Sequence, residues 1–271
     1  MSSELDVQRD CAAIARRLAT VDFPWDTTRA LELALFRTFA SPRIGGLLQA
    51  TGEFAARAQK RYDDTDLIVS EILENGFDSE RGGRAIARMN ALHGRFKIRN
   101  EDFLYVLSTF VVEPIRWNLR FGWRRMTAAE QQAWFWFWRA VGARMGIHDL
   151  PDDLDAFTRF NQDYEAREFR YTPANAAVGG ATRALFMGWF PRPLRPLVRR
   201  AIHAMLDDRL RESFGWPAPS RRLRRLVATA LRLRALLVRL LPARPKYRTR
   251  IPRADYPGGY RIESLGPPPP S

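Results

Sequence analysis

Apolar residues recur at intervals of three and four along almost the whole 271-residue chain, a spacing that gathers them on one side of an α-helix. Alternation of apolar and polar residues between turn pairs, which is typical of β-hairpins, is hard to find. Proline, glycine and capping residues instead divide the chain into helix-length segments, such as residues 26–40 and 63–76. The sequence therefore predicts an all-α protein with a single multi-helix domain.

One helical segment carries five consecutive aromatic residues. Thr127 and Glu130 have the spacing of a capping box, and the run from Trp134 to Trp138 follows on the same helix. Five consecutive residues cover every side of a helix, so this helix must either be central to the core or line a cavity. We expect residues 1–215 to form the helical domain that this segment organises.

Positive charge is confined to one end of the chain. Residues 1–190 hold 25 basic and 25 acidic side chains, whereas residues 191–271 hold 19 basic and 5 acidic ones, which accounts for the whole net charge of +14. A local surplus of this kind indicates a local anionic partner. Residues 216–271 are expected to form a basic amphipathic helix and a proline-rich, irregular tail that pack on the same domain.

The basic helix, within residues 220–241, has an apolar side and an arginine side. The apolar side holds Leu223, Leu226, Ala230, Leu233, Leu237 and Leu240. Closure of the main core by these leucines is the simplest interpretation. The first alternative is binding to an anionic membrane surface. Binding to nucleic acid comes last, because the segment contains no recognisable nucleic-acid-binding module.

Cysteine usage and the N-terminal sequence exclude several classes of protein. Cys11 is the only cysteine, so a disulfide or cysteine-based metal site cannot form within one chain. The N-terminal residues show no signal peptide, and no apolar run reaches the ~18–20 residues of a transmembrane helix. We expect a cytoplasmic protein that is soluble or peripheral to the inner face of the membrane.

Local catalytic motifs are mostly absent, which leaves chemistry that needs a single imidazole. The chain lacks HExxH, GxSxG, a Walker loop and GxGxxG, and His93, His148 and His203 are its only histidines. A haem requires one axial histidine and an apolar helical pocket. His93 shares a helical stripe with apolar residues, although periodicity alone favours a core histidine that is hydrogen-bonded to backbone. His148 is expected at the surface, and His203 receives no role.

Four segments between residues 80 and 165 resemble a known family. They read ERGGRAIARMNALHGRF, KIRNEDFLYVLSTFVVEPIRW, TAAEQQAWFWFWRAVGARMGI and FTRFNQDYE, and they are similar to the catalytic domain shared by the fungal oxygenase MpaB and bacterial rubber oxygenase, the latex-clearing protein. The likeness extends over about residues 30–215, and the ending YPGGYRIESLG is similar as well. The resemblance implies a globin-like haem-binding core, b-type haem, and His93 as its axial iron ligand.

The resemblance also implies distal residues. Rubber oxygenase carries an R-x-x-K-T motif about one helix before the axial histidine, and Arg61, Asp64 and Thr65 match it except that Asp64 replaces the lysine. These three residues are expected to position and polarise dioxygen; a surface ion pair at a helix start is the alternative for Arg61 and Asp64. Arg84 and Arg88 are expected to bind the haem propionates, with solvent-facing side chains as the alternative.

The function implied by the resemblance is a haem b-dependent oxygenase that acts on a lipophilic alkene with dioxygen. Without the distal lysine, polymer cleavage is not expected, and oxidative cleavage of a double bond in a small isoprenoid is the favoured reaction. Two alternatives stay open. One is a non-catalytic haem sensor or carrier, and the other is a helical protein that binds a membrane surface without haem.

Overall fold

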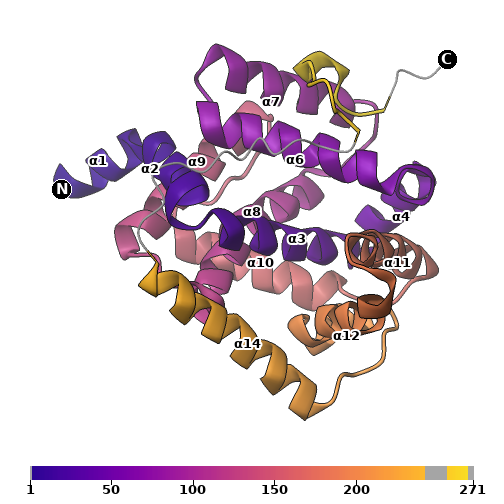
Figure 1. The fold of residues 1–271 in the computed structure, drawn as a ribbon. Helices are drawn as coiled ribbons and strands as arrows, with labels where there is room; N and C mark the ends of the chain where they lie inside the picture. The colour runs from indigo at the N-terminus through magenta and orange to yellow at the C-terminus, as the bar shows by residue number, and fades with distance from the viewer. Residues whose placement is uncertain (1, 242–254, 268–271) are drawn as a thin grey trace.

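The computed structural model describes residues 2–241 and 255–267, and these are helical almost throughout (Figure 1). No strand is present in either range, so the prediction of an all-α, single-domain protein is confirmed. The remainder of the predicted irregular tail, residues 242–254 and 268–271, lies outside the described residues. The helices are α1 (Ser2–Arg9), α2 (Cys11–Arg17), α3 (Pro24–Phe39), α4 (Pro42–Ala50), α5 (Glu53–Ala56), α6 (Ala58–Asn75), α7 (Glu80–His93), α8 (Asn100–Phe121), α9 (Ala128–Arg144), α10 (Leu154–Glu168), α11 (Pro173–Gly188), α12 (Arg195–Met205), α13 (Asp208–Glu212) and α14 (Arg221–Leu240).

The predicted capping box begins α9. The Glu130 amide donates to Thr127 Oγ1 at 3.2 Å, and the Thr127 amide donates to a Glu130 carboxylate oxygen at 2.8 Å. These bonds satisfy two amide groups that a helix start otherwise leaves without an acceptor. Asp153 caps α10 in the same way through the Ala156 amide, at 2.6 Å. Local sequence thus determines where both helices begin.

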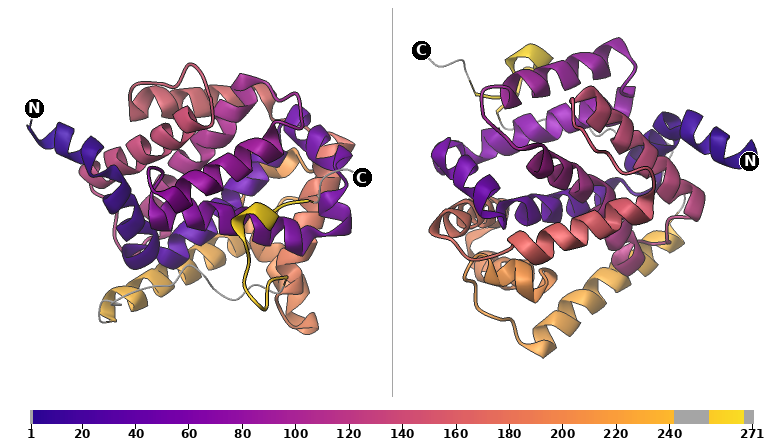
Figure 2. Two further views of the ribbon diagram at one scale, coloured as in Figure 1. Left: turned by 90° about the horizontal axis from the view of Figure 1, so that it is seen from above. Right: turned by 180° about the vertical axis from the view of Figure 1, so that it is seen from behind.

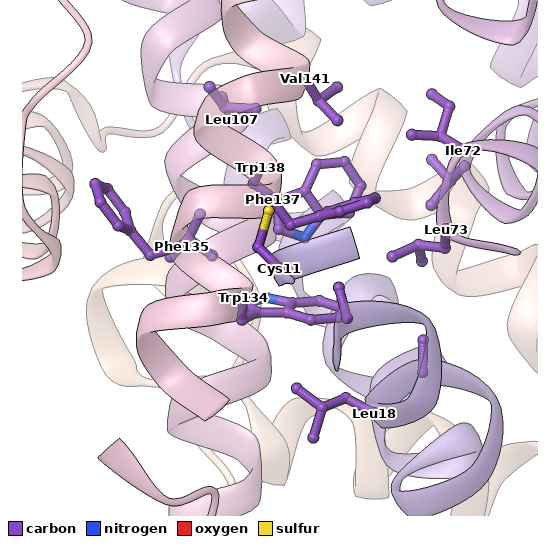
Figure 3. Close-up of a cluster of buried hydrophobic side chains, with 14 of the residues drawn as sticks. Cys11, Leu18, Ile72, Leu73, Leu107, Trp134, Phe135, Phe137, Trp138 and Val141 are labelled. Carbon is purple, nitrogen blue, oxygen red and sulfur yellow. The ribbon is translucent and has the colours of Figure 1, made fainter. Parts of the chain in front are cut away.

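The aromatic run of α9 is central to the core. Trp134, Phe135, Phe137 and Trp138 are at most 3% exposed, and only Trp136 is partly exposed. Figure 3 shows three of them beside residues of α2 and α6, while Phe135 points away to the other side of α9, where it contacts Phe157 of α10. Of the two interpretations of this run, packing in the core is the one that the burial supports.

Helices α6 and α7 pack against each other on one side of the molecule, and residues 255–267 lie along them (Figures 1 and 2). The first turn of α7 starts very close to the end of α6. A Cβ atom at Gly82 would lie 1.9 Å from the carbonyl oxygen of Gly76, so only glycine fits there. This close approach brings together the two helices that carry the predicted site residues.

Helix α14 lies across the opposite side of the molecule from α6 and α7 (Figure 1). It packs on α8 and α12 through Ala228, Leu231 and Ala235. The interpretation in which the predicted leucine side closes the core is wrong, because Leu226, Leu233, Leu237 and Leu240 are all exposed. A different face of the same helix makes the contacts. In the described ranges, no helix has the length and apolar character needed to span a bilayer.

Candidate functional site

His93 lies in the last turn of α7, against the core, as its stripe predicts. Its ring packs on Phe103 of α8 with 5.3 Å between ring centroids. Its Nδ1 atom is buried and has no hydrogen-bond partner among the described residues. Burial, assisted by the nearby positive charge of Arg61, lowers the pKa of His93 to about 4. The imidazole is therefore neutral at physiological pH, and its Nδ1 makes no backbone hydrogen bond within the described ranges.

Arg61, on α6, is the charged group that acts on His93. Its guanidinium donates through Nη1 to Thr65 Oγ1, and the Thr65 hydroxyl donates in turn to the Arg61 carbonyl oxygen at 2.9 Å. The Arg61 side chain also lies over the Phe54 ring, 5.7 Å from its centroid. Burial lowers the pKa of this guanidinium, opposed by the negative charges of Asp64 and Glu53. Thr65 thus orients an arginine that has no ion-pair partner in the described chain.

Asp64 points to different partners. It is 3% exposed, and its two carboxylate oxygens accept from Lys60 Nζ at 3.0 and 2.9 Å. The hydroxyl of Tyr256, in the C-terminal segment, also donates to Asp64 and accepts from Lys60 at 2.8 Å. Arg61 and Asp64 form no ion pair with each other. The positive charge of Arg61, which is hydrogen-bonded to Thr65, therefore acts on His93, whereas the Asp64 carboxylate is bound by Lys60 and the C-terminal segment.

Arg84 and Arg88 also bind the C-terminal segment. Arg84 forms an ion pair with Glu263, and Arg88 Nε donates to the Leu265 carbonyl oxygen at 2.7 Å. Ile262 and Leu265 of the same segment are buried in the main core. We call residues 255–267 the C-terminal strap, because they tie α6 to α7. Propionate binding by the two arginines stays a prediction, and it would compete with these contacts.

The other two histidines do not join the site. His148 is exposed, and only its backbone is bonded, to the Asn100 side chain. His203 is buried on α12, where its ring stacks on Trp216 with 4.9 Å between centroids. Burial, together with nearby arginines, lowers the pKa of His203 to about 4. Within residues 2–241 and 255–267, no three His, Cys, Asp or Glu side chains lie together as a set of metal ligands.

The side chains around His93 fit a haem. Iron in a b-type haem takes a neutral imidazole as its protein ligand, and His93 supplies one in an apolar setting next to Phe103. A half-buried arginine without a carboxylate partner among the described residues, such as Arg61, suits a cofactor or a bound oxygen species that carries negative charge. The buried Nδ1 atom has no hydrogen-bond partner among the described residues, so this ring is not held by a hydrogen bond from that nitrogen.

A second charged region, built around Arg37, has a structural role. Arg37 of α3 binds Glu113, Glu165 and Asp207 at 2.6 to 2.9 Å, which links α3 to α8, α10 and the start of α13. A surface pocket of about 320 Å³ is lined by Arg37, Arg116, Gln162, Glu165, Asp207 and Arg209. Arg37 pairs with Glu165 and Asp207, Arg116 lies 3.9 Å from Glu165, and every lining residue has a polar or charged side chain. This pocket therefore does not suit a lipophilic ligand.

Sequence reasoning did not identify three residues near the site: Lys60, Phe103 and Tyr256. Lys60 stands four residues before Asp64, the spacing of an intrahelical ion pair, and is one of only three lysines in the chain. Tyr256 belongs to the ending whose likeness to the family was noted, but its contact with Asp64 spans 192 positions. Only the spacing of Lys60 could have been found from sequence.

Comparisons with known proteins identify the family to which the chain is similar. The model of the family described as "ER-bound oxygenase mpaB/B'/Rubber oxygenase, catalytic domain" matches residues 19–239. The ER-bound oxygenase mpaB' of Penicillium brevicompactum is 32% identical over 251 residues, covering 86% of this chain and 59% of that protein. The ER-bound oxygenase mpaB of Penicillium roqueforti (strain FM164) is 30% identical over 218 residues, covering 74% and 73%.

A solved structure of latex clearing protein, LCP, in the closed state is also similar. It covers 91% of this chain and 70% of its own, with a TM-score of 0.49 and 16% sequence identity. The chain spans about three fifths of the length of mpaB'. The family model matches far more than half of the residues, and two relatives are at least 30% identical over most of the chain. The chain therefore belongs to the family of mpaB/B' and rubber oxygenase catalytic domains.

Proposed function

We propose that the protein is a haem b-dependent oxygenase that acts on a lipophilic alkene. The observation that carries the proposal is the half-buried, neutral imidazole of His93, whose buried Nδ1 has no hydrogen-bond partner among the described residues and which is affected by the charge of Arg61. Membership of an oxygenase family supports the reaction class. The core around α6, α7 and α8 would then be the globin-like haem-binding core that the resemblance implies.

His93 would hold the haem iron, and its environment prepares it for that role. With a pKa near 4, the ring carries no proton that competes for the ligating lone pair at neutral pH. Packing against Phe103 limits the orientations of the ring. Bound haem supplies an iron centre that activates dioxygen for attack on a carbon–carbon double bond, with cleavage to carbonyl products.

Arg61 and Thr65 would act on the oxygen side of the site. A guanidinium carries five N–H donors. Arg61 uses one of them in its hydrogen bond to Thr65, so others can donate to an electronegative oxygen atom. Thr65 uses its own proton on the Arg61 carbonyl oxygen, which holds the arginine in one orientation. We therefore propose Arg61 as the polarising group and Thr65 as its positioning residue.

Asp64 would contribute by a different route. Its oxygens are occupied by Lys60 and Tyr256, so it would stabilise the C-terminal strap over α6 and thereby keep water from the site. Arg84 and Arg88 reach haem propionates only if they exchange their contacts with the strap. The lipophilic substrate is supported by the apolar side chains beside His93, Leu92 and Phe103, and a short isoprenoid is the favoured candidate.

The test is the absorption spectrum of protein produced with a haem supply, followed by a pyridine haemochrome assay. We expect a Soret band and about one haem b per chain. His93→Ala should lose the haem while keeping its helical circular dichroism, and the exposed His148→Ala serves as the matched control. Folded wild-type protein that retains no haem would refute the proposal.

The reaction is tested separately, with the haem-loaded protein and a short isoprenoid alkene. We expect steady oxygen uptake and carbonyl products detectable by mass spectrometry, both reduced in Arg61→Met without loss of haem. A protein that binds haem but takes up no oxygen would instead be a haem sensor or carrier.

A further inference from the structure

Helix α14 uses only one of its faces to join the fold. Ala228 and Leu231 pack against Trp117 and Phe121 of α8. The same side carries Arg234, which forms an ion pair with the buried Asp26 at 2.7 Å. These contacts attach the helix firmly and determine which of its sides faces solvent.

The solvent side of α14 is rich in leucine. Five leucines of the helix and the one that follows it are each more than half exposed: Leu226 64%, Leu233 55%, Leu236 53%, Leu237 56%, Leu240 75% and Leu241 57%. Their spacing places them along one stripe of the helix, over four turns. A continuous exposed stripe of this kind marks an interaction surface, whereas single exposed leucines are ordinary. We call it the leucine stripe.

Arginines without carboxylate partners border the leucine stripe. Arg225, Arg232 and Arg239 are seven residues apart, so they share one edge of it, and Arg221 and Arg222 precede it. All five are exposed and form no ion pair with any residue in the described ranges. The sequence contains no acidic residue between Glu212 and Asp255. The positive charge beside the stripe is thus uncompensated.

We propose that α14 docks on an anionic lipid surface, lying parallel to it, with the leucine stripe inserted at the boundary of headgroups and acyl chains. The bordering arginines bind lipid phosphates, because their long apolar stems let the guanidinium groups reach the headgroups. A second copy of the chain fits the stripe poorly, since it would bring the same unpaired arginines against each other. This proposal is independent of the proposed haem site on α6 and α7, which lie on the opposite side of the molecule (Figure 1).

The test is co-sedimentation of the full chain with vesicles. We expect at least tenfold stronger binding to phosphatidylcholine vesicles that contain phosphatidylglycerol than to phosphatidylcholine alone, with a loss at high salt. The triple variant Leu233→Ser, Leu237→Ser, Leu240→Ser should lower binding at least tenfold. The control is Tyr171→Ser, which removes an apolar side chain of similar exposure, 57%, outside α14.

Two further measurements separate the alternatives. In Arg225→Gln, Arg232→Gln, Arg239→Gln, the preference for anionic vesicles should disappear while the helix remains folded. A solvatochromic dye on Leu237→Cys should shift to the blue with vesicles, and the same dye on Tyr171→Cys should not; the native Cys11 is buried. Wild-type protein that binds no vesicles, or that forms a dimer dependent on the leucine stripe instead, would overturn the proposal.

Discussion

Acidification should weaken the folded protein through His93. Its pKa is about 4 in the folded protein, against an ordinary value of 6.5, because burial and Arg61 disfavour the charged ring. Between these two values the unfolded chain binds a proton that the folded protein does not bind. The free energy of unfolding therefore falls as the pH drops through this window, and the contribution of His93 is fully retained only above pH 6.5.

The size of the effect follows from the two pKa values. For one group with these values, proton linkage gives a loss of about 2 kcal/mol between pH 7.0 and pH 4.5. His203 has a similarly lowered pKa and adds its own loss, and buried Glu32, whose pKa is raised to about 7, acts with the opposite sign. The contributions of His203 and Glu32 are the same in wild type and in a His93 variant, so they cancel when the two proteins are compared.

The assay is urea unfolding of the haem-free protein at the two pH values, for wild type and for His93→Gln. We expect wild type to lose about 2 kcal/mol more than His93→Gln on acidification. His148→Gln, which changes an exposed histidine, should behave as wild type does. Equal losses in wild type and His93→Gln would show that His93 is protonated in the folded protein, and the argument for a ligand-ready imidazole would fail.

Three other predictions concern the fold and the C-terminal strap. Trp134→Ala should cost about 3–5 kcal/mol in urea unfolding, because the indole is fully buried; a loss below 1 kcal/mol would contradict its central place in the core. Thr127→Ala should cost about 1 kcal/mol in the same assay through loss of the capping box, whereas Thr127→Ser should retain most of that stability. Gly266→Ala should make the strap easier to cleave by limited proteolysis, because Gly266 has a φ of +92° and its Cβ would lie 2.7 Å from Leu92; unchanged cleavage would show that the strap is not held at this point.

Local signals in the sequence were sufficient for most helices. The capping box at Thr127 begins a helix where the sequence predicts it, because a cap acts within one turn. Helix α6 begins at Ala58 rather than at residue 63, since its N-terminal residue Arg57 makes no side-chain cap that a sequence pattern could reveal.

Contacts between distant residues could not be predicted from the sequence. Periodicity correctly predicted that α14 has an apolar side. It does not show whether other residues cover that side, and in the described chain its leucines are exposed. The motif spacing grouped Asp64 with Arg61 and Thr65. Two side chains at positions i and i+3 of a helix can nevertheless point to different groups when one of them is hydrogen-bonded to a distant residue. For Asp64 that partner is Tyr256.

The C-terminal strap also affects the order of events during synthesis. Arg88 of α7 donates a hydrogen bond to Leu265 of the strap, and the two residues are separated by 177 positions. At ribosomal rates of about 5–20 residues per second, the α6–α7 pair leaves the ribosome about 10–35 s before the segment that covers it is made. During this interval that side of the helix pair is open. A cofactor inserted from this side would thus have a limited time to enter, which ends when the last residues of the strap fold into place.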